Sequence, residues 1–117
     1  MKILIIINDA PYGTEKAYNA LRLAMNIQKE KPETEVVIFL MADAVGCAIP
    51  NQNTPQGYYN IERMLKSVIM KNGKIKSCGT CLDARGLSTL PLIEGVERSN
   101  MQELTNLTLG SDKVITF

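Results

Sequence analysis

Short apolar runs alternate along this chain with longer stretches in which apolar residues recur at helical spacing. Residues 3–7 form an unbroken run of isoleucine and leucine, and residues 36–41 form a second apolar run. Continuous runs of this kind are typical of strands that are covered on both faces, as in a parallel sheet. Between them, Thr14 can cap a helix that continues to about Lys31 and ends before Pro32. The pattern therefore predicts a strand, a helix and a strand joined as a right-handed βαβ unit.

The same alternation continues in shorter pieces. Asn60 can cap a helix over residues 61–71, with Gly73 as its left-handed stop, and a short strand over residues 74–77 then places Cys78 at its carboxyl end. One or two helical turns are predicted over residues 80–85, where Gly86 stops them, and a very short strand is predicted at Val96. A capping box of Ser99 and Gln102 predicts a last helix that ends near Leu109, with Gly110 after it. A strand over residues 114–117 follows. No repeat, linker or low-complexity tract interrupts the chain. We therefore expect a single domain over residues 1–117 with an α/β fold, a three-layer α/β/α sandwich.

One segment, residues 43–57, lacks a clear period. Asp43 can begin a short helix, but glycine, proline and asparagine residues then interrupt the pattern. Long irregular connections in compact domains are usually functional or mobile. Ligands of open parallel sheets gather at the carboxyl ends of the strands, and this segment follows a predicted strand. We therefore expect it to line a site or an interface.

Composition narrows the chemistry. The chain has 117 residues, with 13 lysines and arginines against 12 acidic residues and no histidine. The missing histidine excludes Ser-His-Asp and Cys-His catalysis and any histidine-ligated metal. A formal charge of +1 argues against nucleic acid as the main partner. The apolar run near Met1 is too short to span a membrane or to form the core of a signal peptide, so we expect no membrane partner and a cytoplasmic protein.

Three cysteines carry most of the remaining chemistry. Cys78 and Cys81 form a CxxC pair between a predicted strand and a predicted helix. Backbone N–H groups at such a place, with Arg85 about two turns further on, would lower the pKa of Cys78 and make it a nucleophile. From the residues alone, four interpretations stay open: a dithiol redox site, half of a zinc or iron–sulfur site shared between subunits, a sulfur-handling nucleophile, and two buried thiols without a role. We expect neither a metal nor a cofactor, because a single thiol pair without histidine is an incomplete metal site.

Other side chains are expected near the same edge of the sheet. Cys47 lies in the irregular segment and could reach Cys78, although a small residue packed under a loop is the favoured interpretation. Asp43 directly follows a buried strand and is the carboxylate of most interest. Helix capping is nevertheless the favoured role for it, as for Asp9 and Asp83.

The motifs of the chain resemble those of the DsrE/DsrF-like family, and within it the YchN-like branch. The matching stretches are residues 10–13, which include Tyr12, residues 39–41, 43–45 and 57–58, Cys78 with Cys81, Asp83, Arg85 and Gly86, and residues 88–93, 95–97, 111–114 and 116–117. The resemblance implies a mainly parallel five-stranded sheet between helices, and assembly into homotrimers or homohexamers.

The resemblance also implies a function. In the sulfur-relay members of the family, a cysteine upstream of an Arg-Gly pair carries sulfur as a persulfide and passes it to a cysteine of a partner protein. Counting eight residues back from Gly86 gives Cys78. The resemblance thus implies a sulfur carrier or sulfurtransferase with Cys78 as its nucleophile, and with sulfur-donor and sulfur-acceptor proteins as partners. The auxiliary candidates are Cys81, Arg85, Asp43, Tyr12 and Cys47.

This chain departs from the relay pattern at Cys81, because relay members generally have no second cysteine at that spacing. A persulfide on Cys78 could therefore be resolved into an internal disulfide or relayed locally. Two other classes of function stay beside this one: a thiol-redox or metal-binding oligomer that uses the pair, and a small-ligand-binding oligomer without catalysis.

Overall fold

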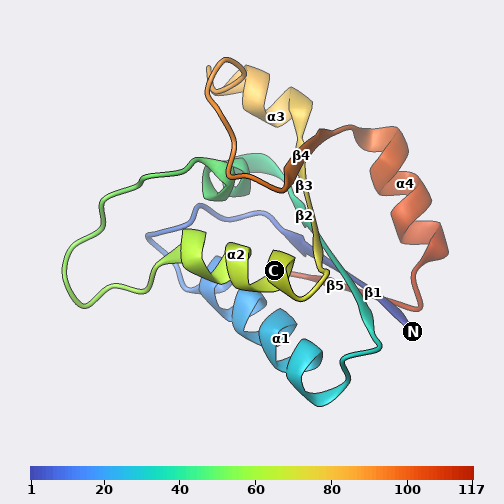
Figure 1. Cartoon of the computed structure of the whole chain (residues 1–117). Helices are drawn as coiled ribbons and strands as arrows, with labels where there is room; N and C mark the ends of the chain where they lie inside the picture. Colours follow the sequence, from blue (N-terminus) through green and yellow to red (C-terminus); the bar gives the residue numbers. More distant parts are fainter.

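Five strands form one sheet in which every neighbouring pair is parallel (Figure 1). The computed structural model describes all 117 residues. The strands are β1 (Lys2–Ile7), β2 (Glu35–Leu40), β3 (Lys74–Cys78), β4 (Val96–Ser99) and β5 (Lys113–Thr116), and their order across the sheet is β4-β3-β2-β1-β5. The predicted five-stranded parallel sheet is confirmed, and β4 is longer than the sequence pattern indicated.

Helices cover both faces of the sheet. The helices α1 (Lys16–Glu30) and α2 (Ile61–Met70) pack together on one face, and α3 (Gly79–Ala84) and α4 (Met101–Gly110) lie on the other side (Figure 1). Successive residues of β1 serve opposite faces: Ile3 and Ile5 pack with α1 and α2, whereas Leu4 packs with residues of α3 and α4. Fully burying one such side chain contributes about 1.5–3 kcal/mol. Because both faces are buried, the strand sequences are continuously apolar, and the predicted three-layer α/β/α architecture is confirmed.

Two helix starts differ from the predictions by one residue. Asn100 caps α4, and its side chain accepts a hydrogen bond from the N–H of Glu103 at 2.9 Å. The predicted capping box that begins at Ser99 is therefore wrong by one residue, and the Ser99 hydroxyl donates to the Glu103 carboxylate instead. Thr14 lies two residues before α1, where its hydroxyl accepts from the N–H of Lys16 at 3.4 Å. The last helix also includes its glycine, which was predicted to follow it.

The end of α2 is a Schellman motif built around Asn72. Asn72 takes the left-handed conformation, with φ of +68°, that the sequence pattern assigned to Gly73. The N–H of Gly73 then donates to the Val68 carbonyl at 2.9 Å and closes the turn. Position 73 requires glycine for a different reason, because there is no room for a side chain: a Cβ atom there would lie 2.4 Å from Val68 Cγ1 and 2.9 Å from Gln28 Nε2.

The connection between β2 and α2 is only partly irregular. Its first part forms a 3₁₀ helix, η1 (Ala42–Ala48), so the irregular part is residues 49–60. This part extends away from the body of the molecule, as the green loop on the left of Figure 1 shows. The Gln52 amide holds the start of the loop by donating to the carbonyls of Gly46 and Ile49 at 2.7 and 2.9 Å. No helix of the structure has the length and apolar character needed to cross a membrane.

Candidate functional site

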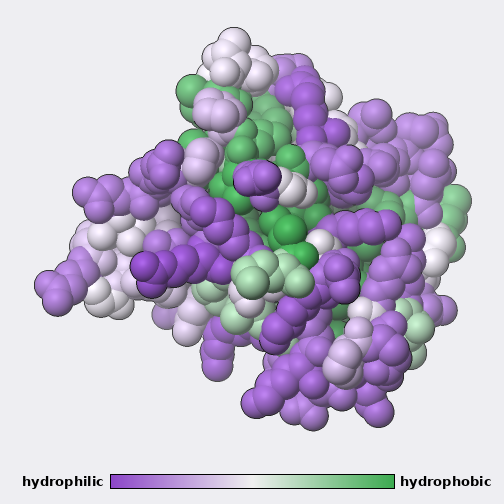
Figure 2. All heavy atoms as spheres, viewed as in Figure 1, coloured by the Kyte–Doolittle hydropathy of each residue, from purple (hydrophilic) through white to green (hydrophobic).

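The two cysteines of the CxxC pair lie where β3 ends and α3 begins. Cys78 is the last residue of β3 and the N-terminal cap of α3. Its sulfur accepts a hydrogen bond from the N–H of Cys81 at 3.4 Å, which is the contact that a capping side chain makes. The pair therefore stands at the carboxyl edge of the sheet. In Figure 2, hydrophobic atoms gather in the middle of the view, below α3, whereas hydrophilic residues cover most of α1.

Gly79 allows β4 to approach this turn closely. A Cβ atom on Gly79 would lie 2.8 Å from Nε of Arg98. The Arg98 guanidinium in turn contacts both carboxylate oxygens of Asp83 at 2.8 Å. Asp83 therefore ties α3 to β4, and the capping role predicted for it is wrong.

Burial dominates the electrostatics of Cys78. Its side chain belongs to the core cluster on the α3 and α4 side, and the residue is only 6% exposed. Burial raises the pKa of Cys78, and the side-chain hydrogen bond with Cys81 raises it further. The N–H groups of Thr80 and Cys81 act in the opposite direction, but more weakly. The sequence-based expectation of a lowered pKa is therefore wrong, because it counted the helix start and not the burial.

Cys81 has a different environment. It is half-buried, and its Sγ accepts a hydrogen bond from the backbone N–H of Ala42 at 3.2 Å. Ala42 follows β2 and has a φ of +50°, which is the left-handed region that non-glycine residues rarely adopt. Such a conformation costs on the order of 1 kcal/mol and persists where the surroundings impose it. The segments that follow β2 and β3 thus meet at the Cys81 sulfur.

Arg85 and Asp43 join the same place from α3 and η1. Nε and Nη2 of Arg85 both lie 2.9 Å from Oδ1 of Asp43. Nη1 of Arg85 donates to the carbonyl oxygen of Cys81 at 3.2 Å. The guanidinium therefore holds the backbone of the CxxC turn against η1, and its charge is paired with a carboxylate. Sequence reasoning brought Cys78, Cys81, Arg85 and Asp43 to one edge, and the structure does place these four residues together.

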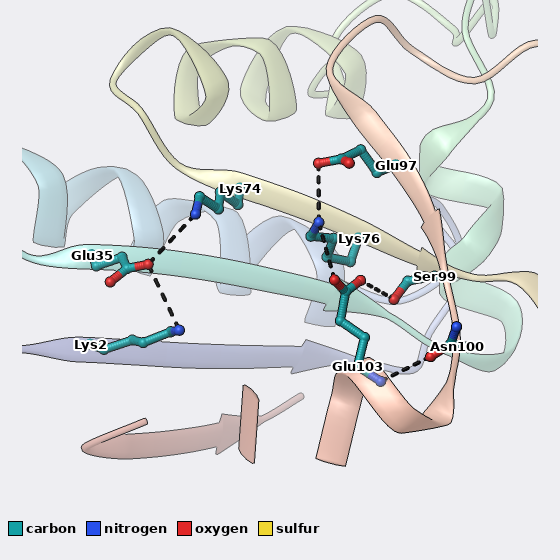
Figure 3. Close-up of polar contacts among 8 residues, drawn as sticks. All are labelled: Lys2, Glu35, Lys74, Lys76, Glu97, Ser99, Asn100 and Glu103. Carbon is teal, nitrogen blue, oxygen red and sulfur yellow. Dashed lines mark hydrogen bonds and ion pairs between the residues drawn. The ribbon is translucent and has the colours of Figure 1, made fainter. Parts of the chain in front are cut away.

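A charged network lies on the same sheet face as Cys78 (Figure 3). Ser99 is the direct partner of Cys78 in the β3–β4 ladder, and its hydroxyl donates to the Glu103 carboxylate. Nζ of Lys76 lies 3.5 Å from Glu103 and 3.0 Å from Glu97, as the dashed lines in Figure 3 mark. The contact with Ser99, together with Lys76, holds the pKa of Glu103 below its usual range. Burial opposes the charged form of Lys76, but the two carboxylates outweigh it and raise its pKa.

Sequence reasoning missed this network and the contact from Ala42. A backbone N–H leaves no trace in the residue types, so Ala42 carried no signal. Lys76 did carry one, because a lysine inside a short strand between buried residues needs a partner for its charge.

Cys47 lies away from the pair. It is buried in the core cluster shared by α1 and α2, whereas Cys78 belongs to the cluster on the opposite face of the sheet. Burial raises the pKa of Cys47 to about 12. Its environment agrees with the packing role that the sequence favoured.

Tyr12 also lies outside the site. Its hydroxyl accepts from the N–H of Ile61 at 3.1 Å, and its ring stacks on Tyr59 with centroids 5.6 Å apart. Tyr59 stacks in turn on Tyr18 of α1, with centroids 4.1 Å apart. Tyr12 therefore anchors the irregular loop and the start of α2 to the body, away from the thiols.

Other places for a ligand lie apart from the cysteines. A surface recess of about 720 Å³ is lined by residues of α1 together with Met64 and Lys71, and it contains none of the candidate site residues. The structure has no group of three or more histidine, cysteine, aspartate or glutamate side chains that could hold a metal ion.

The fold and these residues define a class of protein: a small parallel α/β/α protein with a dithiol at the carboxyl edge of its sheet. The chain belongs to the DsrE/DsrF-like family, which it matches over residues 1–117. Membership of this family supports a role related to sulfur metabolism.

Individual relatives cover nearly the whole chain. It is 46% identical over 116 residues to protein YchN of Escherichia coli K12, a match that spans 99% of this chain and 98% of YchN. It is 43% identical over 115 residues to an uncharacterized protein of Methanopyrus kandleri, spanning 98% of this chain and 93% of that protein. The resemblance to YchN noted from the motifs is confirmed.

Solved structures match the fold. The crystal structure of YchN from E. coli aligns with a TM-score of 0.95 at 46% identity and covers 99% of this chain and 98% of that one. A protein of unknown function from Methanobacterium thermoautotrophicum aligns with a TM-score of 0.80 at 13% identity, over 99% and 98% of the two chains, and shares the fold.

Proposed function

We propose that this chain is a sulfur carrier that holds sulfur as a persulfide on Cys78. It takes the sulfur from a donor protein and gives it to the thiol of an acceptor protein, working in the cytoplasm as a homotrimer or homohexamer. The observation that carries the proposal is the position of Cys78: it ends β3 at the carboxyl edge of the sheet, and its sulfur accepts a hydrogen bond from the backbone N–H of a second cysteine, Cys81. Membership of a family related to sulfur metabolism supports it.

The chemistry needs no histidine. A thiolate attacks the outer sulfur of the donor persulfide, the sulfur–sulfur bond of the donor breaks, and the donor cysteine leaves as a thiolate. Sulfane sulfur moves from one cysteine to another, so no external oxidant or reductant is consumed. The burial of Cys78 suits a carrier, because it keeps a loaded persulfide away from solvent thiols until an acceptor protein docks.

Mass spectrometry of the loaded protein tests the proposal. After incubation with a cysteine desulfurase and cysteine, and removal of both, the protein should gain about 32 Da, the mass of one sulfur atom. Peptide mapping should place this mass on Cys78. A Cys47→Ala variant is the matched control and should load equally, because that thiol is sealed in the opposite core cluster. Absence of the added mass, or its location on Cys47, would overturn the proposal.

A thiol-redox function is the second candidate, and the position of both cysteines in the first turn of α3 favours it. Cys81 donates its N–H to the Cys78 sulfur within one helical turn, and disulfide oxidoreductases use cysteine pairs in the same CxxC spacing. Counting free thiols before and after mild oxidation tests it. Loss of two thiols that a dithiol reductant restores, without any capacity to hold sulfur, would favour the redox function over the carrier.

A further inference from the structure

The two thiols of the pair are not equivalent, and their order along the chain does not decide which one reacts first. In the reduced protein Cys78 is almost fully buried, whereas Cys81 is half-buried. A donor protein approaching the carboxyl edge of the sheet therefore meets the sulfur of Cys81 more readily. Exposure alone does not make a nucleophile, but the two sulfurs also differ in the N–H groups that reach them: that of Ala42 for Cys81 and that of Cys81 for Cys78.

We propose that Cys81 is the thiol that first takes sulfur from the donor, and that it then passes the sulfur inward to Cys78. This inference rests on the proposed sulfur-carrier function and assigns an order to its two cysteines.

A hydrogen bond from Ala42 favours Cys81 as the first nucleophile. Its backbone N–H points at the Cys81 sulfur at 3.2 Å and stabilises negative charge on that sulfur. Ala42 makes this contact in a left-handed conformation that is unfavourable for alanine. The bend that follows β2 thus aims this N–H at the Cys81 sulfur.

The burial of Cys78 argues against it as the first nucleophile. Burial and the side-chain hydrogen bond with Cys81 both raise the pKa of Cys78, so Cys78 is the poorer nucleophile for the first attack. Attack on the donor persulfide is made by a thiolate, and the sulfur that the Ala42 N–H reaches is that of Cys81.

Arg85 holds the turn that carries Cys81. Arg85 donates to the carbonyl of Cys81 and pairs with Asp43 of η1. Ala42, whose N–H reaches the Cys81 sulfur, is the first residue of the same helix η1. The same arginine thus fixes the backbone of Cys81 and the segment whose N–H reaches its sulfur. Arg85 acts as a positioning residue, because it touches the backbone of Cys81 and not its sulfur.

The proposed steps balance. The Cys81 thiolate attacks the outer sulfur of the donor persulfide, and the donor cysteine leaves as a thiolate. Cys78 then loses its proton, its thiolate attacks the outer sulfur of the Cys81 persulfide, and the bond between that sulfur and Cys81 breaks, so that Cys81 leaves as a thiolate. The proton of Cys78 ends on Cys81, and the persulfide ends on Cys78. Each step exchanges one sulfur–sulfur bond for another, with no net oxidation or reduction.

Time-resolved loading of single-cysteine variants tests the order. Wild type, Cys81→Ser, Cys78→Ser and the control Cys47→Ala are mixed with glutathione persulfide, quenched with iodoacetamide at a series of times and mapped by mass spectrometry. In wild type the added sulfur should appear on Cys81 first and on Cys78 afterwards. In Cys78→Ser it should load at the wild-type rate and stay on Cys81. In Cys81→Ser, Cys78 should load at least about tenfold more slowly, because its thiol is protonated and buried.

Loading of Cys81→Ser at the wild-type rate would overturn the inference and leave the sulfur-carrier function standing. Failure of wild type to load from glutathione persulfide and from the cysteine desulfurase alike would instead overturn the carrier function itself. A measurement without variants guards against misfolding: when the unloaded wild-type protein is treated with iodoacetamide near neutral pH, Cys81 should be alkylated before Cys78. The reverse order would also overturn the inference.

Discussion

Replacing Gly73 with alanine should destabilise the fold strongly, although the change adds only a methyl group. The new Cβ atom would lie 2.4 Å from Cγ1 of Val68, 2.8 Å from the Val68 carbonyl oxygen and 2.9 Å from Nε2 of Gln28. Val68 is fully buried, so neither its side chain nor its carbonyl can move aside freely. Gly73 joins α2 to β3, and any shift there is passed along the strand that ends at Cys78.

The contacts set the size of the effect. Overpacking a core by one methyl group costs about 1–3 kcal/mol. Nε2 of Gln28 donates to the carbonyls of Val68 and Lys71 at 3.0 and 3.3 Å, and displacing it weakens both bonds. Each bond is worth about 1 kcal/mol. The lower entropy of alanine in the unfolded chain offsets about 0.5 kcal/mol. The net loss in the free energy of unfolding should be about 2–4 kcal/mol.

Urea unfolding followed by circular dichroism measures this loss. Gly73→Ala should unfold at a lower urea concentration with an unchanged m value. Gly110→Ala is the matched control, because a Cβ atom on Gly110 meets nothing within 4 Å and the residue is the last of α4. It should be neutral or stabilising by less than about 1 kcal/mol. A Gly73→Ala variant within about 0.5 kcal/mol of wild type would refute the packing argument.

Other side chains give shorter tests. Cys47 should resist iodoacetamide near neutral pH while the protein is folded, because burial raises its pKa to about 12; early labelling in timed peptide maps would contradict its packing role. Glu103→Gln should reduce the loss in the free energy of unfolding that accompanies a fall to acidic pH. The folded pKa of Glu103 is lowered by Ser99 and Lys76, so ionised Glu103 stabilises the fold above the ordinary carboxyl range, and this contribution disappears as the pH falls below about 4. Urea midpoints across pH measure the change, and an unaltered profile would argue against the network. Arg85→Ala should lower stability by less than about 1 kcal/mol, because its partner Asp43 is exposed; a larger loss in the same assay would contradict that assignment.

The sheet could be predicted because its signal is local. The unbroken apolar run of β1 requires burial on both faces, and the spacing of the remaining runs leaves room for crossover helices. The parallel order of the strands also predicted that the site lies at the carboxyl edge of the sheet. Helix ends were harder to predict, because Asn72 and Gly73, or Ser99 and Asn100, are adjacent residues with similar capping ability and only packing decides between them.

The chemistry of the site depends on contacts between distant parts of the chain. The sequence indicated that Cys78 starts a helix, but the burial that raises its pKa comes from residues of α3, α4 and the central strands. The N–H that reaches Cys81 belongs to Ala42, which no side-chain pattern marks. Tyr12 matched a family motif, yet its contacts anchor a loop. Residue types therefore locate this dithiol, and only the three-dimensional structure distinguishes its two sulfurs.

The most direct test of the sulfur-carrier function follows one sulfur atom through the protein. The chain is loaded with isotopically labelled sulfur from a persulfide donor, separated from the donor and mixed with an acceptor protein that has a single reactive thiol. The proposed function predicts that the label leaves Cys78 and appears on the acceptor as an intact persulfide, and that Cys78→Ser delivers much less. A protein that takes up no label, or that releases all of it as free sulfide, would contradict the account.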